Sequence, residues 1–179
     1  MVRWVDSREH LTHPLHYVCD KVFGGTLTAG PAVALVRVLL AAGSDVNYGN
    51  GDPLNAAASL GAVEVAFVLL EAGARTDLLG PGGETALHWA AYIGAEELVG
   101  RLIAAGSPTE IKDGRYGGTP LGWALYGWSE SPVPADQGGH REVVLRLARA
   151  GSHVEPEWLA LEQVRSDREV FQALGGKAS

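Results

Sequence analysis

Histidine and cysteine side chains recur every three residues near the start of the chain, at His10, His13, His16 and Cys19. Imidazole nitrogens and thiolate sulfurs are the usual ligands of zinc, so this spacing is the first to be tested as a metal site. A helix through these residues is interrupted at Pro14, which prevents a single face from presenting all four. No other residues have the spacing of metal ligands. We therefore expect neither a metal ion nor a cofactor.

A second group that could take part in catalysis is the pair Asp136 and His140. These residues are four positions apart and could act together as acid and base. The paired glycines at 24–25 and 82–83 lack both the spacing and the lysine of a phosphate-binding loop. We name no catalytic residue and expect that the chain is not an enzyme. The acid–base pair is kept as the alternative.

The composition allows a sizeable core and excludes several classes of function. Apolar residues make up 46% of the 179 residues, and the formal net charge is −7, from 14 Lys and Arg against 21 Asp and Glu. Nucleic acid is excluded as the expected partner, because phosphate binding requires a basic face. No apolar stretch is long enough to span a membrane, and the charged first ten residues do not resemble a signal peptide. The single cysteine cannot form an intrachain disulfide. We expect a cytoplasmic monomer without membrane contact.

The element that must position any site is a pair of helices, seen most clearly from Gly83 to Glu110. Thr85 can cap the first helix, and Gly94 and Gly106 can end the first and second helices. Each helix has apolar residues three and four positions apart, and these are Leu87, Ala90 and Ala91, then Leu98, Val99, Leu102 and Ile103. The spacing predicts a short helix, a tight turn and a longer helix, each with one face to bury.

The same unit occurs four times, and each copy is marked by a leucine: Leu15, Leu54, Leu87 and Leu121. The last two intervals are 33 and 34 residues. The sequence Thr-Ala-Leu-His-Trp-Ala at Thr85–Ala90 resembles the T-P-L-H-x-A motif of the ankyrin repeat, from which it departs only at Ala86. The resemblance covers about residues 11 to 154.

The resemblance implies an all-α fold, a solenoid of helix-turn-helix units with short hairpin turns, forming a single domain over residues 1–179. We expect four repeats, at about 11–47, 50–79, 83–112 and 117–154. Two further short helical patterns follow, and we expect residues 155–174 to form a C-terminal capping pair, because terminal repeats must turn a polar face outward.

Two repeats are longer than the others. The marker leucine lies 19 residues before the closing glycine in the second and third repeats, but 28 before it in the first and 30 in the fourth. We expect the nine and eleven extra residues to form loops between the paired helices, at about 20–30 and 128–138. Long loops on a rigid scaffold are frequent sites of function.

The resemblance also implies which side chains are available to a partner. The two residues before the mid-repeat glycine line the concave face in this family, and the hairpin before the fourth repeat adds two more. The predicted partner-binding residues are Tyr92, Ile93, Arg115, Tyr116, Tyr126 and Trp128. Aromatic side chains and arginine are the usual anchors of protein interfaces. The competing interpretation is that Tyr126 and Trp128 only fasten the second long loop to the scaffold.

Other conspicuous residues have structural roles in this family. Trp89 and Trp123 occupy equivalent positions in adjacent repeats, where the family packs a side chain between helices. His140 follows Gly139 at the family's Gly-His pair, where the histidine is structural. These residues are therefore expected in the scaffold.

The function that the sequence predicts is binding of another protein through the concave face. One alternative is a small-molecule site, with or without enzymatic activity, closed by the two long loops and using Tyr126, Trp128, Asp136 and His140. Another is an acidic inhibitor or immunity protein that blocks a basic toxin or enzyme, since the net charge of −7 would steer a partner with a basic surface.

Overall fold

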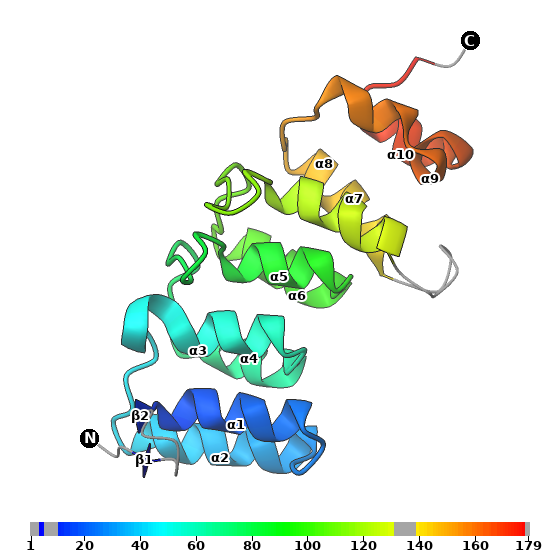
Figure 1. The fold of residues 1–179 in the computed structure, drawn as a ribbon. Helices are drawn as coiled ribbons and strands as arrows, with labels where there is room; N and C mark the ends of the chain where they lie inside the picture. Colours follow the sequence, from blue (N-terminus) through cyan, green and yellow to red (C-terminus); the bar gives the residue numbers. More distant parts are fainter. Residues whose placement is uncertain (1–3, 6–10, 131–138, 178–179) are drawn as a thin grey trace.

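Four helix pairs follow one another along the chain and stack in order into a solenoid, as a computed structural model shows (Figure 1). The structure describes residues 4–5, 11–130 and 139–177. The pairs are α1 (Pro14–Phe23) with α2 (Ala29–Ala41), α3 (Tyr48–Ser59) with α4 (Val63–Glu71), α5 (Ala86–Tyr92) with α6 (Glu96–Ala104), and α7 (Pro120–Glu130) with α8 (His140–Arg149). Before them, β1 (Trp4–Val5) pairs antiparallel with β2 (Leu11–Thr12). The expected all-α repeat architecture is confirmed.

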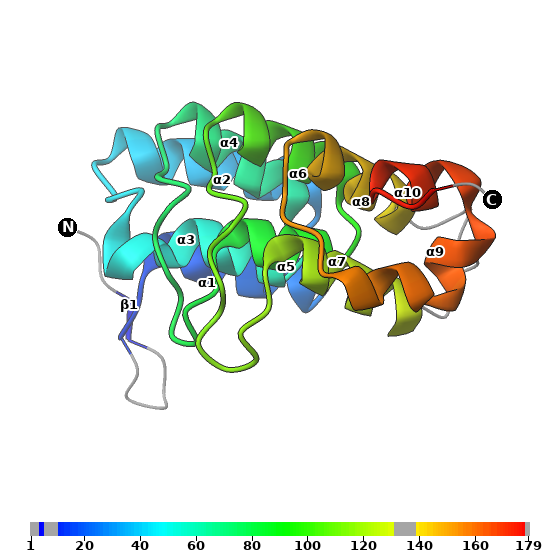
Figure 2. The ribbon, with the colours of Figure 1, turned by 90° about the horizontal axis from the view of Figure 1, so that it is seen from above.

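The solenoid has two layers, which separate when it is seen from above (Figure 2). The inner helices α1, α3, α5 and α7 form one layer, and the outer helices α2, α4, α6 and α8 form the other. The loops at 72–85 and 105–119 project past the inner layer. We call the face of the inner helices beside these loops the concave face. No helix in the described part of the chain is long and apolar enough to cross a membrane.

The marker leucines form the centre of each repeat. Their exposed fractions are 1% or less, and they are Leu15, Leu54, Leu87 and Leu121. Valine and leucine side chains of the outer helices pack against them in one continuous core. The core is therefore assembled from equivalent positions of successive repeats, and this fixes which residues the inner helices present outward.

The first long repeat does not carry the expected loop. Its extra nine residues lengthen the helices, since α1 has 10 residues where α5 has 7, and α2 has 13 where α6 has 9. Only Gly24 to Thr28 remain between α1 and α2, two residues more than between α5 and α6. Most of the extra residues therefore add helical turns instead of forming a mobile flap.

The second long repeat is also helical where its loop was expected to begin. Helix α7 continues to Glu130, so Trp128 lies on a helix and is only 6% exposed. Gly127 allows α7 to approach α5, because a Cβ at this position would collide with the carbonyl oxygen of Tyr92. Residues 131–138, the rest of the predicted loop, lie outside the described residues.

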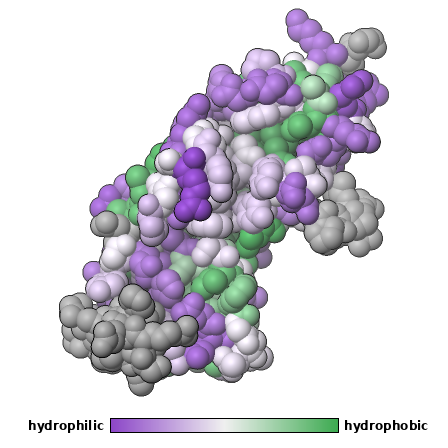
Figure 3. Space-filling model, in the orientation of Figure 1, coloured by the Kyte–Doolittle hydropathy of each residue, from purple (hydrophilic) through white to green (hydrophobic). Residues whose placement is uncertain are grey.

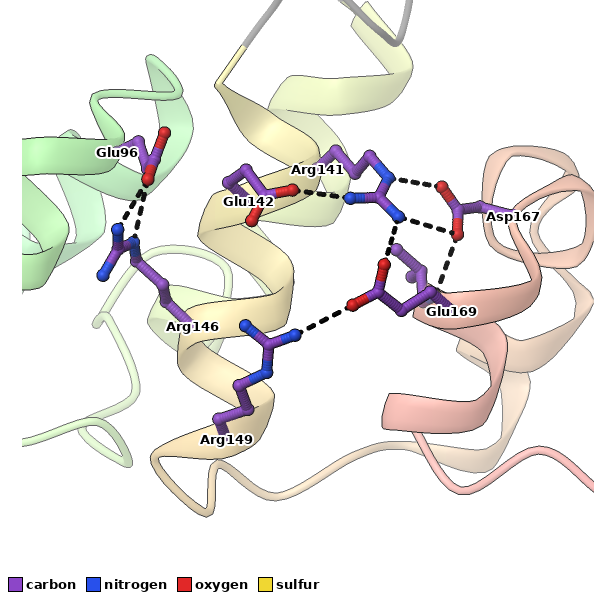
Figure 4. A network of polar contacts seen from close by, with 8 residues as sticks. Glu96, Arg141, Glu142, Arg146, Arg149, Asp167 and Glu169 are labelled. Atoms are coloured by element: carbon purple, nitrogen blue, oxygen red, sulfur yellow. Dashed lines mark hydrogen bonds and ion pairs between the residues drawn. The ribbon is translucent and has the colours of Figure 1, made fainter.

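The C-terminal end of the solenoid is closed by η1 (Pro156–Ala160), α9 (Glu162–Ser166) and α10 (Arg168–Ala173). Arg141 of α8 donates to Asp167 at 2.6 Å and to Glu169 at 2.7 Å, and Arg149 donates to Glu169 at 2.9 Å (Figure 4). Asp167 also caps α10 by accepting from the Val170 amide at 3.0 Å. A charged, hydrogen-bonded contact thus holds the predicted cap on the last repeat.

Candidate functional site

Four aromatic side chains gather on the inner helices of the third and fourth repeats. Trp89 and Tyr92 come from α5, and Trp123 and Tyr126 come from α7. Each pair is three residues apart, so both members lie on the same side of their helix. The corresponding residues of the two helices are 34 positions apart, one repeat. We call these four residues the aromatic cluster.

The rings of the aromatic cluster contact one another directly. Trp89 and Trp123 meet edge to face at 5.0 Å between centroids, and Tyr92 meets Trp123 in the same way at 6.1 Å. Tyr92 also stacks on Tyr126, with centroids 6.2 Å apart and the planes inclined by 18°. Both arrangements are favourable for aromatic pairs. These centroid distances lie in the range of aromatic pairs that pack together, so the four rings form one packed surface.

The cluster is partly open to solvent. Tyr126 is 59% exposed, and the other three rings are half-buried. Seen from the side of the inner helices, pale and green areas interrupt the purple, strongly hydrophilic surface (Figure 3). The structure therefore presents aromatic surface that is already ordered by ring–ring contacts.

Asp113 fixes one edge of the cluster. Its carboxylate accepts from the indole N–H of Trp123 at 3.0 Å and from the backbone amides of Arg115, Tyr116 and Gly118 at 2.7–2.8 Å. Burial of this carboxyl raises its pKa, but the hydrogen bonds, above all those from Tyr116 and Trp123, hold the pKa below its ordinary value. An ionised, 4% exposed carboxylate thus joins the hairpin loop to the aromatic cluster.

The same loop presents two of the predicted partner-binding residues. Arg115 and Tyr116 lie at its tip, where both are exposed and the ring of Tyr116 is 76% exposed. Because their backbone amides both bind Asp113, the tip has a defined conformation. A guanidinium and a phenol ring are therefore held on the loop that touches Trp123.

His88 contacts the ring of Trp123 and links the start of α5 to the hairpin loop at 105–119. Its Nδ1 accepts from the backbone amide of Thr85 at 3.0 Å, which completes a capping box at the start of α5. Its Nε2 donates to the carbonyl of Gly118 at 3.2 Å, and its ring lies against Trp123 with centroids 5.3 Å apart. Burial lowers the pKa of His88, which agrees with a neutral imidazole that accepts on one side and donates on the other.

The remaining predicted residues are placed differently. Ile93 follows α5 and is half-buried, so it can contribute only to the margin of a partner-binding surface. Trp128 is not an exposed anchor, because it lies in the core on the additional turn of α7. Trp89 and Trp123 do pack against each other between helices, as predicted, but they also remain partly exposed. Their contribution to the surface was missed, although the three-residue spacing to Tyr92 and Tyr126 could have indicated it.

Only one member of the suggested acid–base pair lies in the described residues. His140 is buried, and its Nε2 donates to the carbonyl of Tyr92 at 2.8 Å, which ties the start of α8 to the end of α5. Asp136 lies outside the described residues. The histidine therefore has the structural role that the family resemblance implies.

The N-terminal histidines and cysteine are engaged in separate contacts. His13 stacks on Tyr48 at 4.4 Å between centroids, and Nδ1 of His16 lies 2.8 Å from Asp52. Burial raises the pKa of Cys19 to about 12, so this thiol stays protonated near neutral pH. Within the described residues no group of three or more His, Cys, Asp or Glu could hold a metal ion. His10 lies outside them.

Comparison with known families identifies one repeat directly. Residues 82–114 match the family model Ankyrin repeat, and this segment contains α5, α6 and the Asp113 carboxylate. No curated protein matches the chain. Ankyrin repeats are in general modules for protein–protein interaction. Residues 82–114 are therefore an ankyrin repeat, and the stacked helix pairs of the chain fit an ankyrin-repeat protein.

Proposed function

We propose that this protein binds another protein through its concave face, with the aromatic cluster at the centre of the contact. The observation that carries the proposal is the coincidence of two tryptophans and two tyrosines at equivalent positions of adjacent repeats, all partly exposed and packed together. Aromatic side chains dominate the binding energy of many interfaces. Arg115 and Tyr116 on the neighbouring hairpin would extend the contact.

The order of the cluster favours binding over a purely structural role. An immobilised side chain costs about 0.5–1.5 kcal/mol when an interface forms, and rings that already hold one another avoid much of this cost. Tyr126 contacts Tyr92 and still leaves 59% of its surface exposed. A scaffold residue would gain more by burying that surface.

Charge indicates the kind of partner. The chain carries a net charge of −7 and would attract a basic surface during diffusional encounter. On the concave face, Asp20 of α1 is the equivalent of Tyr92 and Tyr126, and Glu130 follows Tyr126 by one turn of α7. Both carboxylates are exposed. We therefore expect the partner to present apolar or aromatic side chains flanked by lysine or arginine.

The test begins with a pull-down from a native cell extract and identification of the partner by mass spectrometry. Its affinity is then measured by calorimetry for the parent chain and for the double variant Tyr92→Ala with Tyr126→Ala. Removal of interface anchors costs about 2 kcal/mol or more, so we expect the affinity to fall roughly thirtyfold or more.

The control is Val38→Ala, which truncates an apolar side chain that is 63% exposed on the outer helix α2, away from the concave face. We expect this control to bind like the parent chain. Circular dichroism establishes that each variant is folded. A folded double variant with unchanged affinity would contradict the proposal.

A further inference from the structure

The carboxylate of Glu84 lies in a buried side chain that has no cationic partner. Glu84 directly precedes the N-cap of α5 and is 9% exposed. Asp77, a carboxylate of the same loop, is paired with Arg75. Within the described residues no ion pair or hydrogen bond reaches the carboxylate of Glu84, and Arg115 on the adjoining hairpin forms none with it. Buried polar groups in proteins are normally hydrogen-bonded, so the binding capacity of this carboxylate is unused in the structure.

Two glycines make room for this carboxylate. A Cβ at Gly80 would lie 2.5 Å from Oε1 of Glu84, and a Cβ at Gly82 would lie 2.6 Å from Oε2. Neither glycine has a positive φ, so it is the space beside the carboxylate that requires glycine at these two positions. Gly82 is itself held in place, because its carbonyl accepts from the amide of Gly114 at 2.7 Å. The loop at 72–85 therefore holds the carboxylate between two residues without side chains.

The start of α5 accounts for an acidic residue at this position but not for its enclosure. Thr85 is the N-cap, so Glu84 lies beside the backbone N–H groups at the helix start, where a negative charge is stabilising. That effect requires neither burial of the side chain nor the two glycines. It also leaves the carboxylate oxygens available to a donor from outside the chain.

One ring of the aromatic cluster is the neighbour of this carboxylate. Glu84 and Trp89 stand one repeat, 34 residues, before Gly118 and Trp123. A Cβ at Gly118 would lie 2.9 Å from Cδ1 of Trp123, so a side chain at this position of the repeat starts against the tryptophan ring. Trp89 is half-buried, which leaves part of its indole open to a ligand. A carboxylate and an indole ring thus meet at the edge of the concave face.

We propose that Glu84 and Trp89 form a binding site for an arginine side chain of the protein partner, an inference that rests on the proposed function and names one group that the concave face recognises. A guanidinium is planar, so it can donate two parallel hydrogen bonds to a carboxylate and also stack on an aromatic ring. The ammonium group of lysine is a compact charge without such a plane. The net charge of −7 favours the approach of either cation.

The experiment uses a small probe and needs no partner protein. The isotopically labelled full chain is titrated with N-acetyl-arginine methylamide to about 50 mM, a range that covers millimolar affinities. NMR follows the indole N–H signals of the five tryptophans, and the variant Trp89→Phe assigns the signal of Trp89. We expect this signal to shift to saturation with the arginine compound. The corresponding lysine compound should bind more weakly, and the uncharged citrulline compound, which has nearly the same shape as arginine, should not shift the signal.

A change at the carboxylate tests the second half of the site. Glu84→Gln keeps the size of the side chain and removes its charge, so the dissociation constant of the arginine compound should rise about tenfold or more. Glu64→Gln is the matched control, because it makes the same change at an exposed position of the outer helix α4 and should bind like the parent chain. Gly80→Ala covers the case in which Glu84→Gln does not fold. Its added methyl group displaces the carboxylate and should weaken binding as well.

Several results would overturn the proposal. They are a Trp89 signal that does not respond to the arginine compound, an equal response to citrulline or lysine, and a folded Glu84→Gln variant with an unchanged dissociation constant. Once the partner is identified, Glu84→Gln should also lower its affinity about tenfold or more, and an unchanged affinity would overturn the proposal. All these failures would leave the proposed contact at the aromatic cluster standing, because the double variant of Tyr92 and Tyr126 tests that contact separately.

Discussion

At the scale of single residues, the candidate site depends on polar groups that sit behind the rings. Asp113 accepts four donors and thereby sets the positions of Trp123 and of the hairpin tip. His88 connects the start of α5 to Gly118 at the end of the same hairpin. The rings are what a partner would contact, and these two residues determine where the rings are.

His88 gives a prediction for the dependence of stability on pH. Burial lowers its pKa from the ordinary value of 6.5, so between the folded pKa and 6.5 the unfolded chain binds more protons. The contribution of His88 is therefore complete above about pH 6.5 and is lost as the pH falls below that value. We expect His88→Gln, which keeps an acceptor for the Thr85 amide but does not titrate, to lose less free energy of unfolding between about pH 7.5 and 5.5.

The comparison is made by urea denaturation of the parent chain and the variant. His16 acts in the opposite direction, because its hydrogen bond with Asp52 raises its pKa, but both proteins retain this pair. Equal loss of stability on acidification in the two proteins would show that His88 is not the group that titrates.

At the scale of secondary-structure elements, the repeat register determines the core. Leu87 is fully buried in the third repeat, between helices of the second and fourth. We expect Leu87→Ala to lower the free energy of unfolding by about 2–5 kcal/mol, because it leaves a cavity that the packed helices cannot fill. Denaturant unfolding measures the change. Leu79→Ala is the control, since this leucine is 45% exposed on a hairpin and should change the stability far less. A loss under about 1 kcal/mol for Leu87→Ala would mean that the assigned register is wrong.

The sequence predicted the helix pairs and the inner-helix positions of Tyr92 and Tyr126, because these follow from leucines 33 and 34 residues apart. It did not predict the lengths of the helices. Nine extra residues in the first repeat could extend a loop or add turns, and spacing alone does not distinguish the two. Trp128 was misplaced for the same reason, since the second long loop was expected to begin at this residue. In the structure, Gly127 allows α7 to pass close to Tyr92 and continue.

Whether an aromatic ring is exposed or buried depends on how neighbouring repeats pack together. Trp89 and Trp123 were expected between helices, because the ankyrin family packs a side chain at these positions. Their edge-to-face contact at 5.0 Å leaves both partly exposed. That outcome depends on the spacing of α5 and α7, which the sequence of neither helix specifies. The three-residue spacing could have indicated that each tryptophan shares a side of its helix with a tyrosine, but the contacts among the four rings follow only from both helices together.

At the scale of the whole molecule, the solenoid separates two surfaces. The C-terminal end is closed by charged contacts of the cap, and the concave face carries the aromatic cluster. A terminal repeat requires a polar outer face, and the cap supplies it while Tyr126 stays 59% exposed.

The central claim is that a protein partner contacts the aromatic cluster, and site-specific cross-linking tests it most directly. Tyr126 is replaced by the photo-crosslinking amino acid p-benzoylphenylalanine. In a second protein Val38 is replaced, because it is 63% exposed against 59% for Tyr126 and lies on the outer helix α2. After irradiation with the partner obtained by pull-down, we predict a cross-linked product from position 126 and none from position 38. A product from position 38 together with none from position 126 would contradict the account.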